Sequence, residues 1–466
     1  MVEWDLIGNL YRRGLDHVLD HIFGYLNYNC LRSTELVSIV WQQATLEGKI
    51  WKNLLSRNMF LFPCWRDMFL ALKGMKHKSL DFQDDSSSEY YRKICCLIET
   101  ELQLLESNWK KMKYSERKCE FGPLHHSACS DYFDLSGDWI VRVQKDRRIV
   151  IRNRWTLEIE NVLEIPIMQI QFKGEVPILN SVKMSDSFIV ASFCRHPEIC
   201  VWNTKTRDLI YVIDGDSLSI QENEEDYDVL FSCGLRLWKN LLLSCHARSL
   251  EGLDLSWILT LRSLPPSVDE EVAILHQAVI SGPGHFWGLL MDEIYILIFF
   301  SKFSPTNLST GGICIEIRNT KSFEIKTVIK FEDKNMPHDF HYSNGLIATG
   351  HRGKPIRIWD VVTGHCISKI PYRETLAAIR LVSNKYIVSC DESGKLKIWD
   401  LQTALKLDRK PNSTCLVKTI PPPRVPYVDE LFVASIAADE FQIVVITQFD
   451  RRSFCLNVKN FLDAAK

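Results

Sequence analysis

The sequence contains no C-x-x-C pair, although it contains 15 cysteines. The only adjacent pair is Cys95–Cys96, so the spacings that are typical of zinc sites and of thioredoxin-like redox sites are absent. Cys200, Cys314 and Cys455 lie inside apolar runs, where a thiol behaves as a small hydrophobic side chain. We therefore expect no metal site and a reducing compartment.

An excess of one charge sign and a long apolar run are also absent. The 56 basic and 58 acidic residues give a formal net charge of −2, which argues against nucleic acid or an anionic membrane as the main partner. The most apolar stretch, 286–300, is interrupted by Asp292 and Glu293 and is shorter than the roughly 20 residues of a membrane-spanning helix. Residues 1–17 are too polar for a signal peptide. We expect a soluble protein of the cytosol, the nucleus or both.

The motifs of the common enzyme classes are missing or incomplete. His17 and His21 are four residues apart, but Val18 stands where a zinc metalloprotease has glutamate. The Gly-Lys pairs at 353–354 and 394–395 lack the upstream glycine and the following serine or threonine of a phosphate-binding loop. No G-x-S-x-G occurs. We predict a non-catalytic chain without a cofactor.

Three apolar stripes at helical spacing fall within the first 57 residues and predict three short helices. So small a module cannot bury all of this surface by itself. The pattern alone is compatible with a module that needs a partner and with a helical cap on a larger core. The stripes consist of Leu15, Val18, Ile22 and Leu26; of Leu36, Val37, Val40 and Trp41; and of Trp51, Leu54 and Leu55.

Several short segments in this region resemble an F-box, most closely that of the β-transducin-repeat-containing protein family. They are the sequences at 13–17, 35–37 and 50–52, together with Trp41. The resemblance implies that this segment binds the Skp adaptor of an SCF-type cullin–RING ubiquitin ligase. The positions that it implies as adaptor-facing are Leu15, Ile22, Leu26, Leu31, Val37, Trp41 and Trp51.

Two departures from the family pattern concern the adaptor and the oligomeric state. F-boxes usually open with Leu-Pro, whereas Leu10 and Tyr11 stand before the Arg-Arg-Gly of this chain. The loss of proline implies weaker docking. The dimerisation segment that the family carries upstream of the F-box is absent apart from a few residues.

A polar stretch at 81–88 precedes a long predicted helix that ends near Trp109. About 25 residues at roughly 1.5 Å each would span nearly 40 Å, which predicts a rigid connection between two bodies. The sequences at 98–100 and 105–109 resemble the linker helix of the same family. We expect an F-box over 1–57 and a helical linker over 58–118.

Short strand-like runs with turn residues replace the helical pattern from about residue 119, and they repeat. The segments 355–360 and 395–400 are near copies that end in Trp359-Asp360 and Trp399-Asp400, and 198–203 is a weaker copy. Four degenerate units lie at 149–153, 253–254, 315–319 and 454–457. Because a four-stranded blade cannot bury both of its faces alone, the seven units predict a seven-bladed all-β WD-repeat propeller over 119–466. The overall prediction is an α+β multidomain chain.

The propeller region also resembles the β-transducin-repeat family, in which one end of the central channel binds a doubly phosphorylated degradation motif. The family pattern has tyrosine or arginine at four strand starts, and these positions fall on Asp131, Asn335, Ala377 and Phe432. The phosphate-binding set is therefore largely lost. Four cations near the connections between second and third strands remain as predicted client-binding residues: Lys145, Arg195, Arg248 and Arg352. Taken singly, each has the ordinary alternative of a solvated loop charge.

Two classes of function follow. The resemblance implies a substrate receptor that binds the Skp adaptor and cullin–RING core through the F-box, and a client protein, phosphorylated or not, through the propeller. The alternative is a WD-repeat scaffold or decoy receptor whose F-box has decayed. An acidic run at 222–228 is a further candidate for shielding a basic site, if it lies at the same end of the propeller.

Overall fold

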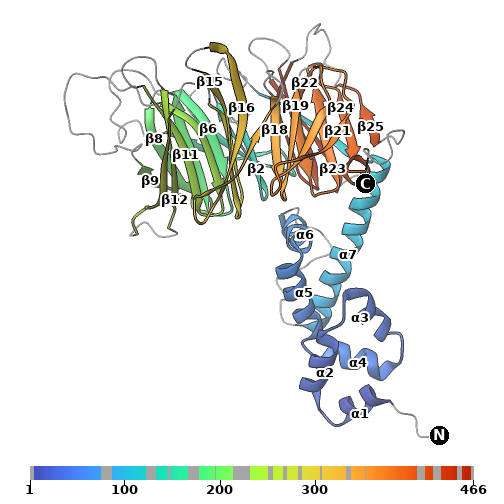
Figure 1. Cartoon of the computed structure of the whole chain (residues 1–466). Helices are drawn as coiled ribbons and strands as arrows, with labels where there is room; N and C mark the ends of the chain where they lie inside the picture. Colours follow the sequence, from blue (N-terminus) through green and yellow to red (C-terminus); the bar gives the residue numbers. More distant parts are fainter. Residues whose placement is uncertain are drawn as a thin grey trace. The chain divides into compact units, whose positions relative to one another are not determined.

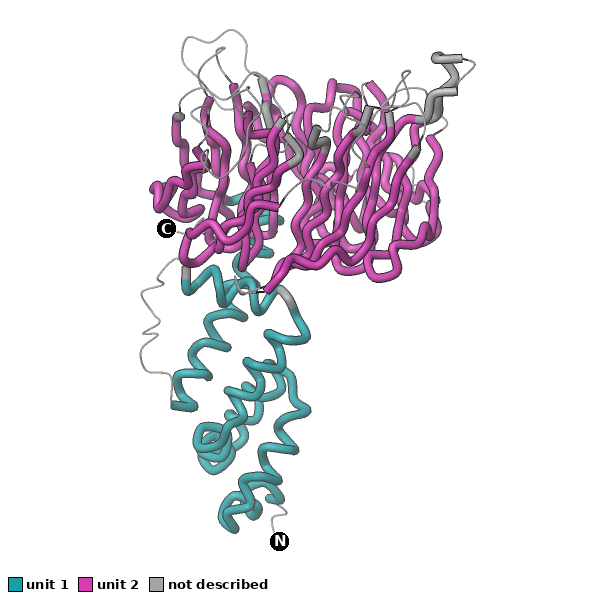
Figure 2. Tube along the Cα trace, turned by 90° about the vertical axis from the view of Figure 1, so that its left-hand side faces the viewer, with its two compact units in different colours: residues 1–113, 464–466 teal, residues 114–463 magenta. Residues whose placement is uncertain are grey.

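The computed structural model describes most of the chain. The described residues are 5–74, 87–121, 133–144, 148–165, 178–194, 196–213, 231–249, 255–265, 270–281, 286–304, 307–331, 337–351, 353–406, 415–422, 432–448 and 454–462. The chain forms two compact units, one of residues 1–113 with 464–466 and one of residues 114–463 (Figure 2). The predicted fold class, helices followed by a seven-bladed propeller, is confirmed.

The first unit is helical throughout its described part (Figure 1). Its helices are α1 (Leu6–Arg12), α2 (Asp16–Gly24), α3 (Tyr28–Thr34), α4 (Ile39–Glu47), α5 (Ile50–Leu61), α6 (Pro63–Gly74) and α7 (Ser88–Lys111).

Side-chain caps explain why these helices are shorter and more numerous than the apolar stripes predict. Asn27 accepts a hydrogen bond from the backbone N–H of Cys30 and starts α3. Ser38 accepts one from the N–H of Trp41 and starts α4. The second predicted stripe is therefore divided, and Leu36 and Val37 lie between two helices rather than within one.

The long predicted helix is confirmed as α7, which has 24 residues and is about 36 Å long. Ser87 caps its start, and Met112 ends it in the left-handed conformation. Its buried residues include Ile94, Ile98 and Leu105, and α7 contacts α4, α5 and α6. The helix is thus an integral part of the first unit and not an isolated rod.

The second unit consists of seven four-stranded antiparallel sheets, each a blade (Figure 1). Blades one to three are β2–β5 (Phe133–Ser136, Trp139–Gln144, Arg148–Asn153, Ile159–Glu164), β6–β9 (Ile178–Met184, Phe188–Cys194, His196–Asn203, Leu209–Ile213) and β10–β13 (Phe231–Trp238, Leu241–Ser249, Leu255–Ser263, Ala273–Ser281). Blades four to six are β14–β17 (Phe286–Met291, Tyr295–Ser304, Asn307–Asn319, Ile325–Lys330), β18–β21 (Pro337–Ser343, Leu346–His351, Ile356–Asp360, Cys366–Ile370) and β22–β25 (Leu376–Val382, Tyr386–Asp391, Leu396–Asp400, Leu416–Ile420); the short α8 (Leu401–Ala404) follows β24.

The seventh blade joins the two ends of the propeller sequence. Strands β26 (Phe432–Ala438), β27 (Gln442–Gln448) and β28 (Phe454–Asn460) supply three of its strands, and β1 (Ser115–Phe121) pairs antiparallel with β28 as the fourth. Glu116 of β1 accepts hydrogen bonds from Asn457 (2.6 Å) and Lys459 (3.1 Å) of β28. The ring is therefore closed by a strand that immediately follows the helical unit in sequence.

The two clearest repeat motifs lie where the pattern predicts, at the ends of third strands. Trp359 and Trp399 are 8% and 5% exposed, and their indole N–H groups donate to Thr349 Oγ1 and Ser389 Oγ at 3.0 and 2.9 Å. In the third and seventh blades, the predicted repeat units do not coincide with the end of the third strand. The ladder there places Ser263 and Asn460 opposite the start of the second strand, as Asp360 and Asp400 are in theirs. The predicted unit of the seventh blade ends at Asn457 instead, and the predicted unit at 253–254 lies outside the described residues.

The cysteine side chains of the interior behave as expected for an apolar environment. The cysteines that the structure describes are free thiols, and burial raises the pKa of Cys200 to about 12. Within the described part of the chain, no helix is both long enough and apolar enough to cross a membrane.

Candidate functional site

The predicted adaptor-facing residues separate into interior and surface positions of the helical unit. Leu31 and Trp51 have no exposed surface, and Trp51 packs edge-on against Tyr28 with ring centroids 6.2 Å apart. Val37 is 59% exposed. The half-buried members of the set are Leu15, Ile22, Leu26 and Trp41.

Three apolar side chains at the link between α3 and α4 are exposed to solvent. Leu36 is 85% exposed and Ile39 is 75% exposed, on either side of Val37. The link is held in place because the buried carboxylate of Glu35 pairs with Arg92 of α7 at 2.8 Å and with Arg32 at 2.5 Å. We call Leu36, Val37 and Ile39 the α3–α4 patch. A fixed, exposed apolar group of this kind is typical of a protein-binding surface.

Of the four predicted client-binding cations, only Arg248 lies within the described residues. Lys145, Arg195 and Arg352 lie outside the described residues, as does the acidic run at 222–228. Arg248 belongs to β11, where its backbone pairs with Ser256 of β12. Their role in client binding stays a prediction. Of the strand-start positions, Ala377 is half-buried in β22, Phe432 belongs to β26, and Asp131 and Asn335 are outside the described residues.

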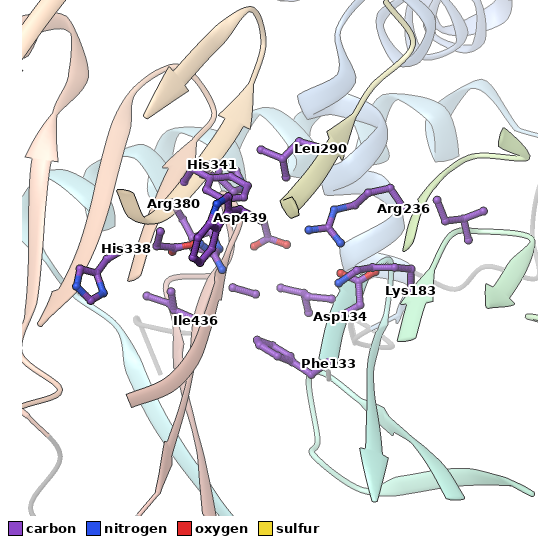
Figure 3. Close-up of a pocket in the computed structure, with 17 residues that line it drawn as sticks. Phe133, Asp134, Lys183, Arg236, Leu290, His338, His341, Arg380, Ile436 and Asp439 are labelled. Atoms are coloured by element: carbon purple, nitrogen blue, oxygen red, sulfur yellow. The ribbon is translucent and has the colours of Figure 1, made fainter. Parts of the chain in front are cut away.

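A cavity of about 360 Å³ lies among the inner strands of the propeller (Figure 3). All seven innermost strands, β2, β6, β10, β14, β18, β22 and β26, contribute to its lining. The cavity is therefore part of the central channel. Its size is near the lower end of the range for ligand pockets.

One residue of each inner strand occupies an equivalent position in this lining. In every blade it pairs across the ladder with an aliphatic residue of the second strand that has no exposed surface, for example Arg236 with Leu243 and Arg380 with Val388. Six of the seven also lie two residues before a hairpin turn of the same length, with a two-residue loop. We call these seven residues the channel ring: Asp134, Lys183, Arg236, Leu290, His341, Arg380 and Ala437.

Asp134, Lys183 and Arg236 form one side of the channel ring (Figure 3). Asp134 Oδ2 accepts a hydrogen bond from the backbone N–H of Met184 at 2.9 Å, which ties blade one to blade two. Burial raises the pKa of Asp134, although the charges of Lys183 and Arg236 act in the opposite direction. Lys183 is 9% exposed, so its ammonium group is held within the channel wall.

His341 and Arg380 form the opposite side (Figure 3). His341 Nδ1 accepts from the N–H of Leu381 at 3.1 Å, in the same inter-blade arrangement as Asp134 with Met184, so the neutral ring carries its proton on Nε2. Burial, with the charges of Arg380 and Arg236, lowers the pKa of His341 to about 3. Arg380 forms an ion pair with Asp339 at 2.6 Å.

The third carboxylate of the lining, Asp439, is already engaged. Asp439 forms an ion pair with Arg154 at 2.7 Å and accepts from the backbone N–H groups of Phe441 and Gln442 at 2.9 Å each. The Arg154 side chain is only 4% exposed. Asp439 is thus a structural link between the first and seventh blades.

The channel ring was not predicted from the sequence. The family pattern directs attention to strand starts and to the connections between second and third strands, and the strands that flank those connections end on the side of the propeller where the inner strands begin. The ring lies toward the other end of the inner strands. The available signal was a cation at the same position of three blades, at Lys183, Arg236 and Arg380, five or six residues before the second strand begins.

Comparison with known proteins gives a partial match. No protein-family model matches the chain. It is 27% identical over 166 residues to "F-box and WD repeat domain-containing 11-A" of Danio rerio, a stretch that is 35% of this chain and 29% of the relative. The chain therefore matches under a third of that relative's length.

Solved structures resemble the chain only distantly. A computationally designed protein, Ika8, gives a TM-score of 0.42 at 11% identity and covers 72% of this chain and 98% of its own. A chain of the Mitotic Checkpoint Complex gives 0.47 at 14% identity, over 74% and 90%. The fold rests on the seven sheets and not on these likenesses. The chain is similar, over part of its length, to an F-box and WD-repeat protein.

Proposed function

We propose that the chain is the substrate-recognition subunit of an SCF-type cullin–RING ubiquitin ligase, active in the cytosol, the nucleus or both. The helical unit binds the Skp adaptor, and the propeller binds a client protein. The partial similarity to an F-box and WD-repeat protein supports this proposal, as does the combination of a helical unit with a closed propeller.

The α3–α4 patch is the observation that carries the adaptor proposal. Burial of apolar surface contributes about 25 cal/mol per Å², so covering exposed leucine, valine and isoleucine side chains stabilises a complex. Val37 belongs to the set that the F-box resemblance implies, and Leu36 and Ile39 extend it. Leu31 and Trp51, which are buried, contribute indirectly, because they pack the helices that present the patch.

The adaptor proposal is tested by capture of purified Skp adaptor on the full chain. We expect Leu36→Ser with Val37→Ser to weaken binding at least about 10-fold, because residues at the centre of an interface carry most of its energy. Both side chains are largely exposed, so folding should be unaffected. The matched control is Leu61→Ser with Leu70→Ser, which removes exposed apolar side chains (54% and 43%) elsewhere in the same unit. Equal binding by both doubles would contradict the assignment of the patch.

The alternative, a WD-repeat scaffold or decoy receptor, makes the opposite prediction for the unmodified chain. A folded chain that captures no Skp adaptor would favour it. The half-buried Trp41 is a poor probe for this question, because its indole N–H donates to Asp5 at 2.8 Å and its loss would perturb the helical unit itself.

Client binding at the propeller is proposed for the four predicted cations, Lys145, Arg195, Arg248 and Arg352. A client that requires phosphate should lose affinity when it is treated with phosphatase, and each cation changed to glutamate should weaken its capture. Capture that is insensitive to all four changes would place the client surface elsewhere on the propeller.

A further inference from the structure

The seven residues of the channel ring include more cations than carboxylates. Lys183, Arg236 and Arg380 line the cavity, and Arg154 lies directly behind Asp439. Three carboxylates oppose these four cations, namely Asp134, Asp339 and Asp439. Arg154 is paired with Asp439 and does not line the cavity, so the whole lining holds three cations and three carboxylates. Within the channel ring itself, three cations stand against one carboxylate, Asp134, in a concave space where charge interactions are stronger than in bulk water.

Hydrogen-bond donors on one side of the ring are available to a ligand. Arg380 uses Nη1 for Asp339 Oδ2 and for the carbonyl of Ile379, so Nε and Nη2 have no partner among the described residues. Nε2 of His341 likewise has none within the described part of the chain, because the contact of this side chain with Leu381 occupies Nδ1. Both side chains face the cavity (Figure 3). They can therefore donate to the same bound group.

The carboxylates of the lining would repel a bound anion, but each of them already accepts hydrogen bonds from neighbouring groups. Asp339 accepts from Arg380 and from the N–H of Ile379 at 2.8 Å, and Asp439 from Arg154. Asp134 accepts from Met184 between two cations. Leu290 and Ala437 complete the ring with apolar surface, which lowers the local dielectric constant.

We propose that the channel ring binds a small free oxyanion, a phosphate- or carboxylate-bearing molecule, between Lys183 and Arg236 on one side and His341 and Arg380 on the other. Charge-assisted hydrogen bonds from guanidinium and ammonium groups suit both oxyanions. The ring residues are not among the four predicted client-binding cations. It does not depend on the ligase role, since the ring is complete whether or not the helical unit binds an adaptor.

The test is isothermal titration calorimetry of the full chain with inorganic phosphate and, separately, with succinate, at constant ionic strength. We expect a dissociation constant below about 1 mM for at least one of the two probes. The stronger probe distinguishes a phosphate from a carboxylate ligand. Absence of binding by both probes at 10-fold higher concentration would overturn the proposal.

Matched lysine variants show whether binding occurs at the ring. Lys183→Met removes a ring charge, and Lys239→Met removes a 64% exposed charge of blade three outside the ring. We expect the first to weaken binding roughly 10-fold or more and the second to leave it unchanged. Because Lys183 is buried, Arg236→Gln provides a second, half-buried ring variant, with circular dichroism as the check on folding. A folded ring variant that binds the probe as tightly as the parent would place the anion elsewhere and refute the assignment.

Discussion

At the scale of single residues, one position near the end of each third strand is taken by tryptophan, arginine or lysine in all seven blades. Tryptophan occupies it at 202, 359 and 399, but arginine occupies it at three other blades and Lys459 at the seventh. Arg262 is 2% exposed and donates to Ser244 Oγ at 2.8 Å, as Trp399 donates to Ser389 Oγ. In this blade the arginine reproduces the hydrogen bond of the indole, whereas Arg152, Arg318 and Lys459 donate to other acceptors. This substitution explains why four repeats look degenerate in sequence, and why the frame was misplaced in two of them.

We expect Trp399→Ala to lower the free energy of unfolding by about 3–5 kcal/mol, through the cavity that it leaves and the lost hydrogen bond to Ser389. The comparison is Trp238→Ala, which removes a 37% exposed tryptophan and should cost roughly 1 kcal/mol or less. Urea unfolding followed by circular dichroism in the β region measures both. Similar losses for the two variants would mean that Trp399 has no special role in its blade.

His341 gives the propeller a pH-dependent stability. Its folded-state pKa of about 3 lies below the value near 6.5 of an unfolded histidine, so between these pH values only the unfolded chain binds the proton. The free energy of unfolding therefore falls as the pH falls, by up to about 2 kcal/mol between pH 7 and pH 5.

The substitution His341→Asn isolates this effect, because the side-chain oxygen can still accept from Leu381 N–H while the titrating group is gone. We expect the unfolding midpoint of this variant to depend less on pH between 7 and 5 than that of the parent. Parallel pH profiles for the two proteins would show that His341 is solvated and titrates normally.

At the scale of elements, the sequence pattern predicted the type of structure better than its boundaries. The long helix was predicted because its apolar spacing is uninterrupted, and it is present as α7. The α3–α4 break was missed because Leu36 and Val37 fit a helical stripe, whereas the cap at Ser38 and the Glu35–Arg92 ion pair end one helix and start another. Hydrophobic periodicity cannot predict such side-chain contacts, because the Glu35–Arg92 pair joins residues 57 positions apart in the sequence.

At the scale of the whole molecule, seven blades could be counted from the sequence, but the closure of the ring could not. The strand that completes the seventh blade, β1, carries four charged residues in SERKCEF and has no repeat signature. Its partner β28 lies at the other end of the propeller sequence. Only the three-dimensional pairing, with Glu116 next to Lys459, reveals that β1 belongs to the propeller.

Two truncations that differ by eight residues test this closure. A chain that begins at residue 114 keeps β1, and we expect it to fold as a propeller without the helical unit. A chain that begins at residue 122 lacks β1 and leaves β28 as an open edge beside apolar blade surface, so we expect aggregation or loss of a cooperative unfolding transition. Size-exclusion chromatography and thermal unfolding measure both. Equal folding of the two would show that β1 is dispensable.

The pairing of β1 with β28 also determines when the propeller can close during translation. Cys119 and its partner Leu456 are about 340 residues apart, so at roughly 5–20 residues per second the early strand waits about 17–70 seconds for its partner to leave the ribosome. During that interval the nascent blades have no closed ring, and chaperones have time to bind them. The abundance of this protein in a cell should therefore respond to chaperone supply and to translation speed over the last blade.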